Sequence, residues 1–253
     1  MGPTSLWNCC DGTAESDGCQ VAKAHVTDTL DYNNIRGFVS TIDKDAPGQV
    51  FALDCEMCNT TKGNELTRVT VIDYKGETCY ESLVKPDNPI VDYNTRFSGI
   101  TAEDMVGVTT NIREVQAHLL LKFEAKDILI GHSLESDMRA LKLIHSTVVD
   151  TSVVFPHKMG PPFKRALKTL AAEQIQRIIQ NGGNDGMMYR ILLLQKLFSV
   201  DGHDSKEDAL ACLDLMKQKV TGDVSKLQSQ VRANNSSKRR DAYLTDPDSV
   251  KLT

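Results

Sequence analysis

The chain has 253 residues, of which 40% are hydrophobic, and its formal net charge at pH 7 is −5. This is enough apolar material for one substantial domain with appendages. No segment reaches transmembrane length, and the first residues lack the apolar core of a signal peptide, so we expect neither a membrane nor a secreted protein. Seven cysteines, an odd number, also favour a reducing compartment.

Residues 1–45 are predicted to form an N-terminal arm, with a short helix near Leu30 to Ser40. The arm carries Cys10, Cys19 and His25, which are residue types that bind zinc. A structural zinc site normally has four ligands, and the fourth would have to be the adjacent Cys9 or a residue further upstream. Free thiols in an arm without metal are the alternative interpretation.

The first strand of the domain is predicted near residues 50–57 and carries two carboxylates, Asp54 and Glu56. Residues i and i+2 of a strand point to the same face, so these side chains project next to each other. Two neighbouring negative charges on an apolar strand are costly unless a cation neutralises them. Hard divalent ions such as Mg²⁺ and Mn²⁺ prefer oxygen ligands, and the pair therefore predicts a metal site.

Strands near 66–74 and 78–84 are predicted to continue an antiparallel meander, and a helix is predicted from Asn111 onward. A short apolar strand at 127–131 then precedes a predicted helix at 133–144, with Ser133 as its N-cap. Asp137 lies in the first turn of that helix. Because the helix dipole alone favours an acid there, a structural role for Asp137 is the alternative to a catalytic one.

A strand near 147–154 and a helix at 164–180 extend the α/β pattern, and a last helix is predicted at 205–219 with Ser205 as its N-cap. His203 and Asp208 lie at the start of this last helix. An insert at 181–200 precedes it, with a Gly/Asn-rich opening and an apolar continuation. Residues 221–253 lack apolar periodicity and predict a disordered tail.

Together these residues resemble the active site of the DEDD exonucleases of the ribonuclease H-like fold, in the subgroup that includes a histidine. Asp54-x-Glu56 resembles the first motif of that family, the segment 132–137 the second, and His203-x4-Asp208 the third. The longer segments 65–71, 84–101 and 145–152 are similar to RNA exonuclease 1 homologs, the elongin-A-binding group. The resemblance implies an α/β domain at 46–220, with a ribonuclease H-like mixed β-sheet flanked by helices.

The chemistry of these residues agrees with that resemblance. The carboxylates of Asp54, Glu56, Asp137 and Asp208 could hold two Mg²⁺ or Mn²⁺ ions about 3.5–4 Å apart, a separation suited to phosphodiester cleavage. His203 is suited to accept the proton of an attacking water near neutral pH. The resemblance implies hydrolysis of single-stranded RNA from its 3′ end, release of 5′-mononucleotides, a nuclear location and elongin A as a partner.

The resemblance also implies contacts with the substrate. Met57 would pack against the terminal nucleotide, although an ordinary apolar strand residue is an equal alternative. Asn94, Arg96 and Ser98 lie in a loop that resembles the family's loop beside the terminal ribose and phosphates. Arg96 could bind phosphate and Asn94 could read the 2′-hydroxyl. DNA is the alternative substrate, and it would leave the chemistry of cleavage unchanged.

The insert at 181–200 leaves a second function open, because it adjoins the loop that carries His203. If it displaced that loop, the general base and the fourth carboxylate would leave the site. The chain would then be a catalytically impaired, splice-type variant that retains the fold and acts as a nucleic-acid-binding or scaffold protein.

Overall fold

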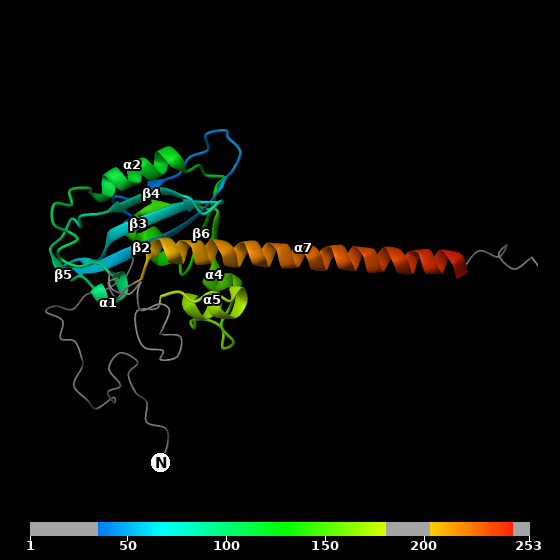
Figure 1. Ribbon diagram of the computed structural model, residues 1–253. Coiled ribbons are helices and arrows are strands. Elements are labelled where there is room, and N and C mark those ends of the chain that lie inside the picture. The colour runs from blue at the N-terminus through cyan, green and yellow to red at the C-terminus, as the bar shows by residue number, and fades with distance from the viewer. Residues whose placement is uncertain (1–34, 181–202, 245–253) are drawn as a thin grey trace, which may run out of the picture.

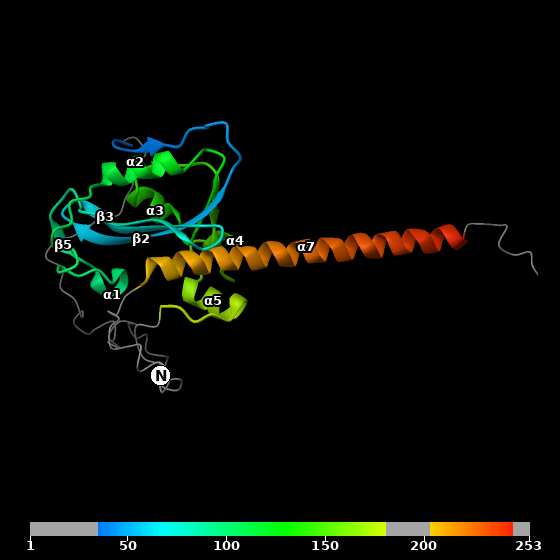
Figure 2. The same cartoon turned by 45° about the horizontal axis from the view of Figure 1, so that its top comes forward.

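A mixed β-sheet with helices on both faces forms the centre of the molecule (Figures 1 and 2). The computed structural model describes residues 35–180 and 203–244. The strand order in the described sheet is β4-β3-β2-β6-β8, and β5 pairs with β2 beyond this path. The strands are β2 (Val50–Thr60), β3 (Gly63–Asp73), β4 (Thr78–Leu83), β5 (Ile90–Asp92), β6 (Ile128–Gly131) and β8 (Val148–Asp150).

The sheet combines an antiparallel and a parallel half. The pairs β2–β3, β3–β4 and β2–β5 are antiparallel, whereas β2–β6 and β6–β8 are parallel. A second, two-stranded sheet joins β1 (Val39–Ser40) to β7 (Leu143–Ile144) in parallel. The predicted α/β fold with a mixed sheet is therefore confirmed, and β1 shows that ordered structure begins before residue 46.

The alternation of side chains along β2 divides the core into two parts. Phe51, Leu53 and Cys55 point into one cluster, which also contains residues of α2 (Ile112–Lys122). Ala52 points to the opposite face and packs with residues of α5 (Leu167–Ile175) and α7 (Ser205–Leu244). Asp54 and Glu56 continue the row that starts at Ala52, so both face the α7 side of the sheet.

Three helices are short: α1 (Thr95–Ser98), α3 (Glu135–Ala140) and α4 (Thr151–Val154). The helix predicted at 133–144 ends at Ala140, because Lys142 adopts a positive φ of 48° and the chain then enters β7. The strand predicted near 147–154 ends at Asp150, whose side chain caps α4. No helix forms over residues 35–40, where the chain makes a turn and enters β1.

The helix α7 runs along the sheet and projects beyond the body of the domain (Figure 1). It continues to Leu244, past residue 220, into the segment predicted as a disordered tail. Residues 223–244 contain neither proline nor glycine, so the sequence holds no strong helix breaker there. The insert at 181–200, the arm up to residue 34 and residues 245–253 lie outside the described residues. None of the described helices is long and apolar enough to cross a bilayer.

Candidate active site

Strand β2 supplies two carboxylates to the face covered by α7. Asp54 pairs across the sheet with Thr70 of β3, and the Thr70 hydroxyl lies 2.7 Å from the hydroxyl of Ser205 at the start of α7. This contact places the N-terminus of α7 over Asp54. Glu56 is 6% exposed. The two acids therefore project between the sheet and the helix, as their i, i+2 spacing predicts.

The helix α3 supplies the third carboxylate, Asp137, which is 4% exposed. Its Oδ1 accepts a hydrogen bond of 2.8 Å from the backbone N–H of Cys55. Since Cys55 lies between Asp54 and Glu56 in β2, this bond fixes Asp137 next to both. The spacing along the chain exceeds 80 residues, and only the tertiary fold brings the three acids together.

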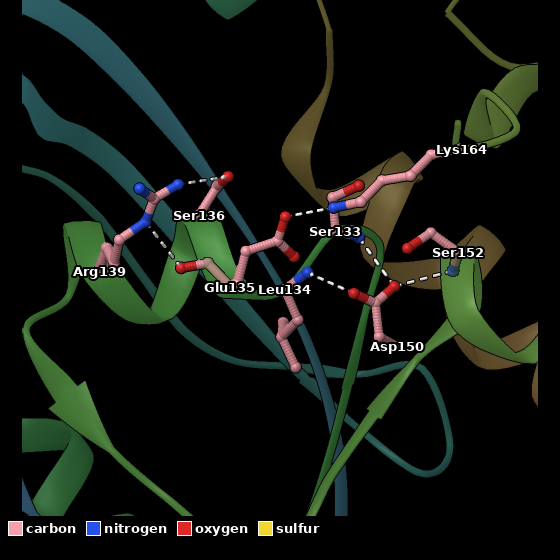
Figure 3. A network of polar contacts seen from close by, with 8 residues as sticks. All are labelled: Ser133, Leu134, Glu135, Ser136, Arg139, Asp150, Ser152 and Lys164. Atoms are coloured by element: carbon pink, nitrogen blue, oxygen red, sulfur yellow. Dashed lines mark hydrogen bonds and ion pairs between the residues drawn. The ribbon is translucent and has the colours of Figure 1, made fainter. Parts of the chain in front are cut away.

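The N-terminus of α3 is held by Asp150, not by Ser133 as predicted (Figure 3). The two Asp150 oxygens accept hydrogen bonds from the backbone N–H groups of Ser133, at 2.9 Å, and Leu134, at 3.0 Å. Oδ1 also accepts one from Ser152 N, at 2.8 Å. Ser133 has a φ of 54°, so its backbone does not adopt the extended conformation of an N-cap.

The N-terminus of α7 is likewise capped by a different residue from the one predicted. Asp204 Oδ1 accepts hydrogen bonds from the N–H groups of Lys206, at 2.9 Å, and Glu207, at 3.4 Å. Ser205 is instead buried, and its hydroxyl contacts Thr70. Asp208 follows in the first turn, where it is 2% exposed and faces the sheet.

His203 is adjacent to this last carboxylate. Its Nδ1 lies 3.4 Å from Asp208 Oδ2, and its backbone N–H donates to the carbonyl of Phe97 at 2.9 Å. The Phe97 ring meets the imidazole edge-on, with 6.4 Å between ring centroids. His203 therefore sits between the start of α7 and the loop of α1.

The four acids affect one another electrostatically. Burial, followed by the charges of Asp208 and Asp137, raises the pKa of Glu56 to about 9. Burial and the charges of Asp137 and Glu56 raise the pKa of Asp54 well above its usual value. Burial also raises the pKa of Asp137 to about 7, although the Cys55 N–H opposes that shift. A bound cation would reverse the penalty on each charged form.

The polar atoms of the site fit divalent cations. Glu56 Oε1 and Asp208 Oδ1 are buried, and neither has a hydrogen-bond partner in the part of the chain that the structure describes. Orphaned buried carboxylate oxygens are costly, and a hard cation would satisfy both of them. Across residues 35–180 and 203–244, no three His, Cys, Asp or Glu side chains already stand at coordinating positions.

The residues predicted to contact substrate have different environments. Met57 is half-buried and packs against the core cluster on the α2 side, which agrees with its role as an apolar strand residue. Asn94 has a φ of 54° and precedes α1, and Arg96 is exposed with its guanidinium 5.7 Å from the centroid of the Phe97 ring. Ser98 is 1% exposed.

Ser98 supports the loop from inside. Its hydroxyl donates to the carbonyl of Tyr93 at 2.9 Å and accepts from the N–H of Ile100 at 3.1 Å. Both functions of this hydroxyl are engaged within the protein, and contact between Ser98 and a substrate stays a prediction. The possible zinc ligands Cys10, Cys19 and His25 lie outside the described residues.

Two polar side chains at the site were not predicted. Asp150 precedes Thr-Ser at the start of α4, which is a recognisable N-cap signal for that helix but does not reveal the contact with α3. Gln180 Nε2 donates to Asp208 Oδ2 at 2.8 Å. A glutamine at the end of a predicted helix has no pattern that would reveal this contact.

Solved structures share this fold. The Saccharomyces cerevisiae Pan2 pseudoubiquitin hydrolase–RNA exonuclease module, in complex with AAGGA RNA, matches with a TM-score of 0.56 and 21% identity. The match covers 80% of this chain and 34% of that one. No family model matches the sequence. The chain has the ribonuclease H-like fold predicted from the sequence, and four carboxylates and a histidine lie together on one face of its mixed sheet.

The chain is a homologue of the RNA exonuclease 1 homologs, and the predicted resemblance is confirmed. It is 51% identical over 219 residues to the human RNA exonuclease 1 homolog. This alignment covers 85% of this chain and 16% of that protein. It is 52% identical over 223 residues to the human putative exonuclease GOR, which covers 87% of this chain and 30% of that protein. The chain thus spans less than a third of the length of these relatives.

Proposed function

We propose that the chain is a metal-dependent 3′-5′ exoribonuclease that hydrolyses the terminal phosphodiester of single-stranded RNA and releases 5′-mononucleotides. The observation that carries the proposal is the convergence of Asp54, Glu56, Asp137, His203 and Asp208 between β2, α3 and α7. The homology to proteins named as RNA exonucleases supports the reaction and the substrate class.

The four carboxylates are the groups that would hold two Mg²⁺ or Mn²⁺ ions, and Glu56 Oε1 and Asp208 Oδ1 are ready acceptors. When bound, such ions activate a water and neutralise charge on the phosphate and leaving oxygens. The protein's part is to fix these oxygens in place. The Cys55 N–H holds Asp137, and the Thr70–Ser205 contact holds the first turn of α7 against β2.

His203 is the proposed general base. With Nδ1 next to the Asp208 carboxylate, the proton of the neutral imidazole is favoured on Nδ1, which leaves Nε2 with a lone pair. Nε2 would take the proton of the attacking water. Phe97 holds the loop of His203 through its carbonyl and its ring.

Substrate would approach from the loop of α1. Arg96 is exposed beside this loop and would bind a phosphate, and Asn94 would contact the 2′-hydroxyl of the terminal ribose. With a net charge of −5, the chain is expected to hold an RNA end locally and to capture it weakly at long range. A nuclear location and elongin A as a partner are further proposals, which rest on the family resemblance.

Product analysis tests the direction of the reaction. We expect a 5′-labelled RNA to shorten stepwise from its 3′ end and to release 5′-mononucleotides, whereas a 3′-phosphate should slow the first step. A DNA strand of the same sequence should be degraded more slowly if Asn94 reads the 2′-hydroxyl. Internal cuts, or nucleoside 3′-phosphates as products, would contradict the proposed reaction.

A scaffold function is the second candidate, and the position of the insert favours it. Residues 181–202 separate Gln180 from His203, and both of these contact Asp208. A version of the chain without residues 181–200 should retain activity similar to the full chain if the insert is tolerated. If the full chain does not cleave RNA and the shortened chain does, an impaired variant that binds without cleaving would be favoured.

A further inference from the structure

The side chain of Gln180 ends at the carboxylate of Asp208. Its Nε2 donates to Asp208 Oδ2 at 2.8 Å, and the same oxygen lies 3.4 Å from His203 Nδ1. The amide must present its NH₂ group in this contact, because an amide oxygen would repel a carboxylate. Oδ2 is therefore engaged from two sides, while Oδ1 of the same group is buried and has no partner among the described residues.

Neighbouring contacts fix Gln180 in this position. Its backbone N–H donates to Glu207 Oε2 at 3.1 Å, so Gln180 binds two consecutive residues of α7. The preceding Ile179 is 2% exposed in the core cluster beneath α7. Arg177 Nη1 pairs with Asp214 Oδ2 at 3.2 Å, two turns further along the same helix. A residue held by its backbone and its neighbours can direct its side chain with little loss of entropy.

The engaged and free oxygens of Asp208 differ in what they can do. A donor on Oδ2 restricts rotation of the carboxylate and fixes the direction in which Oδ1 points. In metal sites, hydrogen bonds to a ligating carboxylate orient it, and their loss typically lowers metal affinity by about 10–100-fold. Gln180 has the geometry of such a group.

We propose that Gln180 is a positioning residue of the metal site, which holds Asp208 Oδ2 so that Oδ1 is directed at a divalent ion. The inference rests on the proposed metal-dependent function. The proposal also gives a role to the two residues that flank residues 181–202. The residues on either side, Gln180 and His203, meet at one oxygen of Asp208, so the fourth carboxylate is oriented by described residues on both sides of that segment.

Binding of Mn²⁺ to the full chain without RNA, measured by isothermal titration calorimetry, tests this role. Gln180→Met keeps the length of the side chain and removes the donor, and Gln180→Asn keeps the amide but shortens its reach. Gln218→Met is a matched control, because Gln218 is exposed on α7 beyond the site. Thermal unfolding in EDTA is recorded for each variant.

We expect the Kd for Mn²⁺ to weaken about 10-fold or more in Gln180→Met and Gln180→Asn. The control should stay within about twofold of the unmodified chain, and melting temperatures in EDTA should change little. A residue with only a structural role would lower the melting temperature and leave the Kd of the folded protein unchanged. An unchanged Kd in either folded variant overturns the proposal, and a tighter Kd would show that Gln180 competes with the ion.

The same experiment separates this inference from the proposed function. An unmodified chain whose Mn²⁺ binding is insensitive to Asp54→Ala would overturn the metal-dependent function and the role of Gln180 with it. Binding that is lost in Asp54→Ala but retained in the Gln180 variants would overturn the role of Gln180 alone.

Discussion

Glu56 is a buried acid that keeps its proton at neutral pH while no cation is bound. Its pKa of about 9 arises first from burial and then from the charges of Asp208 and Asp137. One of its oxygens has no hydrogen-bond partner among the described residues. The residue therefore destabilises the metal-free fold and is available to a metal, as expected where function and stability conflict.

Glu56→Gln should raise the stability of the metal-free protein while abolishing cleavage. At pH 8 an unfolded Glu56 ionises, which favours the unfolded state, whereas a glutamine cannot ionise. We therefore expect the free energy of unfolding to rise by about 1 kcal/mol or more, or Tm by roughly 2–4 °C. Thermal unfolding in EDTA measures this change. Glu77→Gln is the control, because Glu77 is exposed, and it should leave both Tm and cleavage near their original values.

His203→Ala should lower kcat by about 10²–10⁴-fold and change KM little, because a general base acts on the water and not on substrate binding. Initial rates across a pH series test this role, since the variant should lose the dependence on protonation of an imidazole. Added imidazole should restore part of the rate. A variant with unaltered kcat would remove His203 from the mechanism.

At the scale of elements, the position of Asp137 depends on a cap supplied by another strand. Asp150, at the end of β8, accepts hydrogen bonds from Ser133 and Leu134 ahead of α3 and from Ser152 in α4 (Figure 3). Backbone hydrogen bonds and the Ser152 side chain hold the pKa of Asp150 below its usual value, despite the opposing effect of burial. One carboxylate thus connects β8, α3 and α4.

Asp150→Ala should destabilise the protein by about 1–3 kcal/mol, because it leaves several N–H groups without an acceptor. Chemical denaturation measures the loss. The folded pKa lies below the unfolded value of about 3.9, so the contribution is present above that value and is lost as pH falls through the folded pKa. Asp150→Asn keeps one acceptor oxygen and should lose less stability than Asp150→Ala. Cleavage should also decrease in both variants, because α3 positions Asp137. Equal stability of all three proteins would contradict this role.

Sequence patterns identified the long elements and missed the contacts between distant segments. The period-2 pattern of β2 predicted that Asp54 and Glu56 share a face, because this property is local. The sequence pattern predicts Ser133 and Ser205 as the caps of α3 and α7, whereas Asp150 and Asp204 accept the hydrogen bonds in the structure. Gln180 could not be predicted at all, since its partner lies 28 residues away and carries no spacing rule.

At the scale of the whole molecule, the acids make stability depend on pH. The unfolded carboxyl groups lose their protons near pH 4, whereas native Asp137 and Glu56 keep theirs up to about 7 and about 9. The native state therefore binds more protons between these values, and its stability decreases as pH rises through this window.

The Tm in EDTA should thus fall as pH rises from about 5 towards 9, more steeply below 7 where both groups contribute. Mg²⁺ or Mn²⁺ should stabilise the protein more at pH 8 than at pH 6, because ions and protons compete for the same carboxylates. Differential scanning fluorimetry over a pH series, with and without metal, measures both effects. A metal-induced shift in Tm that is the same at both pH values would argue against binding at these acids.

The most direct test of the account is cleavage of a 5′-labelled single-stranded RNA by the full chain and by Asp54→Ala. Both proteins are stripped with EDTA and then titrated with Mg²⁺ or Mn²⁺. We predict a ladder that shortens from the 3′ end in the unmodified chain, only after metal is added. Asp54→Ala should remain folded and inactive, because removal of one carboxylate relieves repulsion in the metal-free site. Undiminished cleavage by Asp54→Ala, or cleavage in EDTA, would contradict the assignment of these acids to a metal-dependent active site.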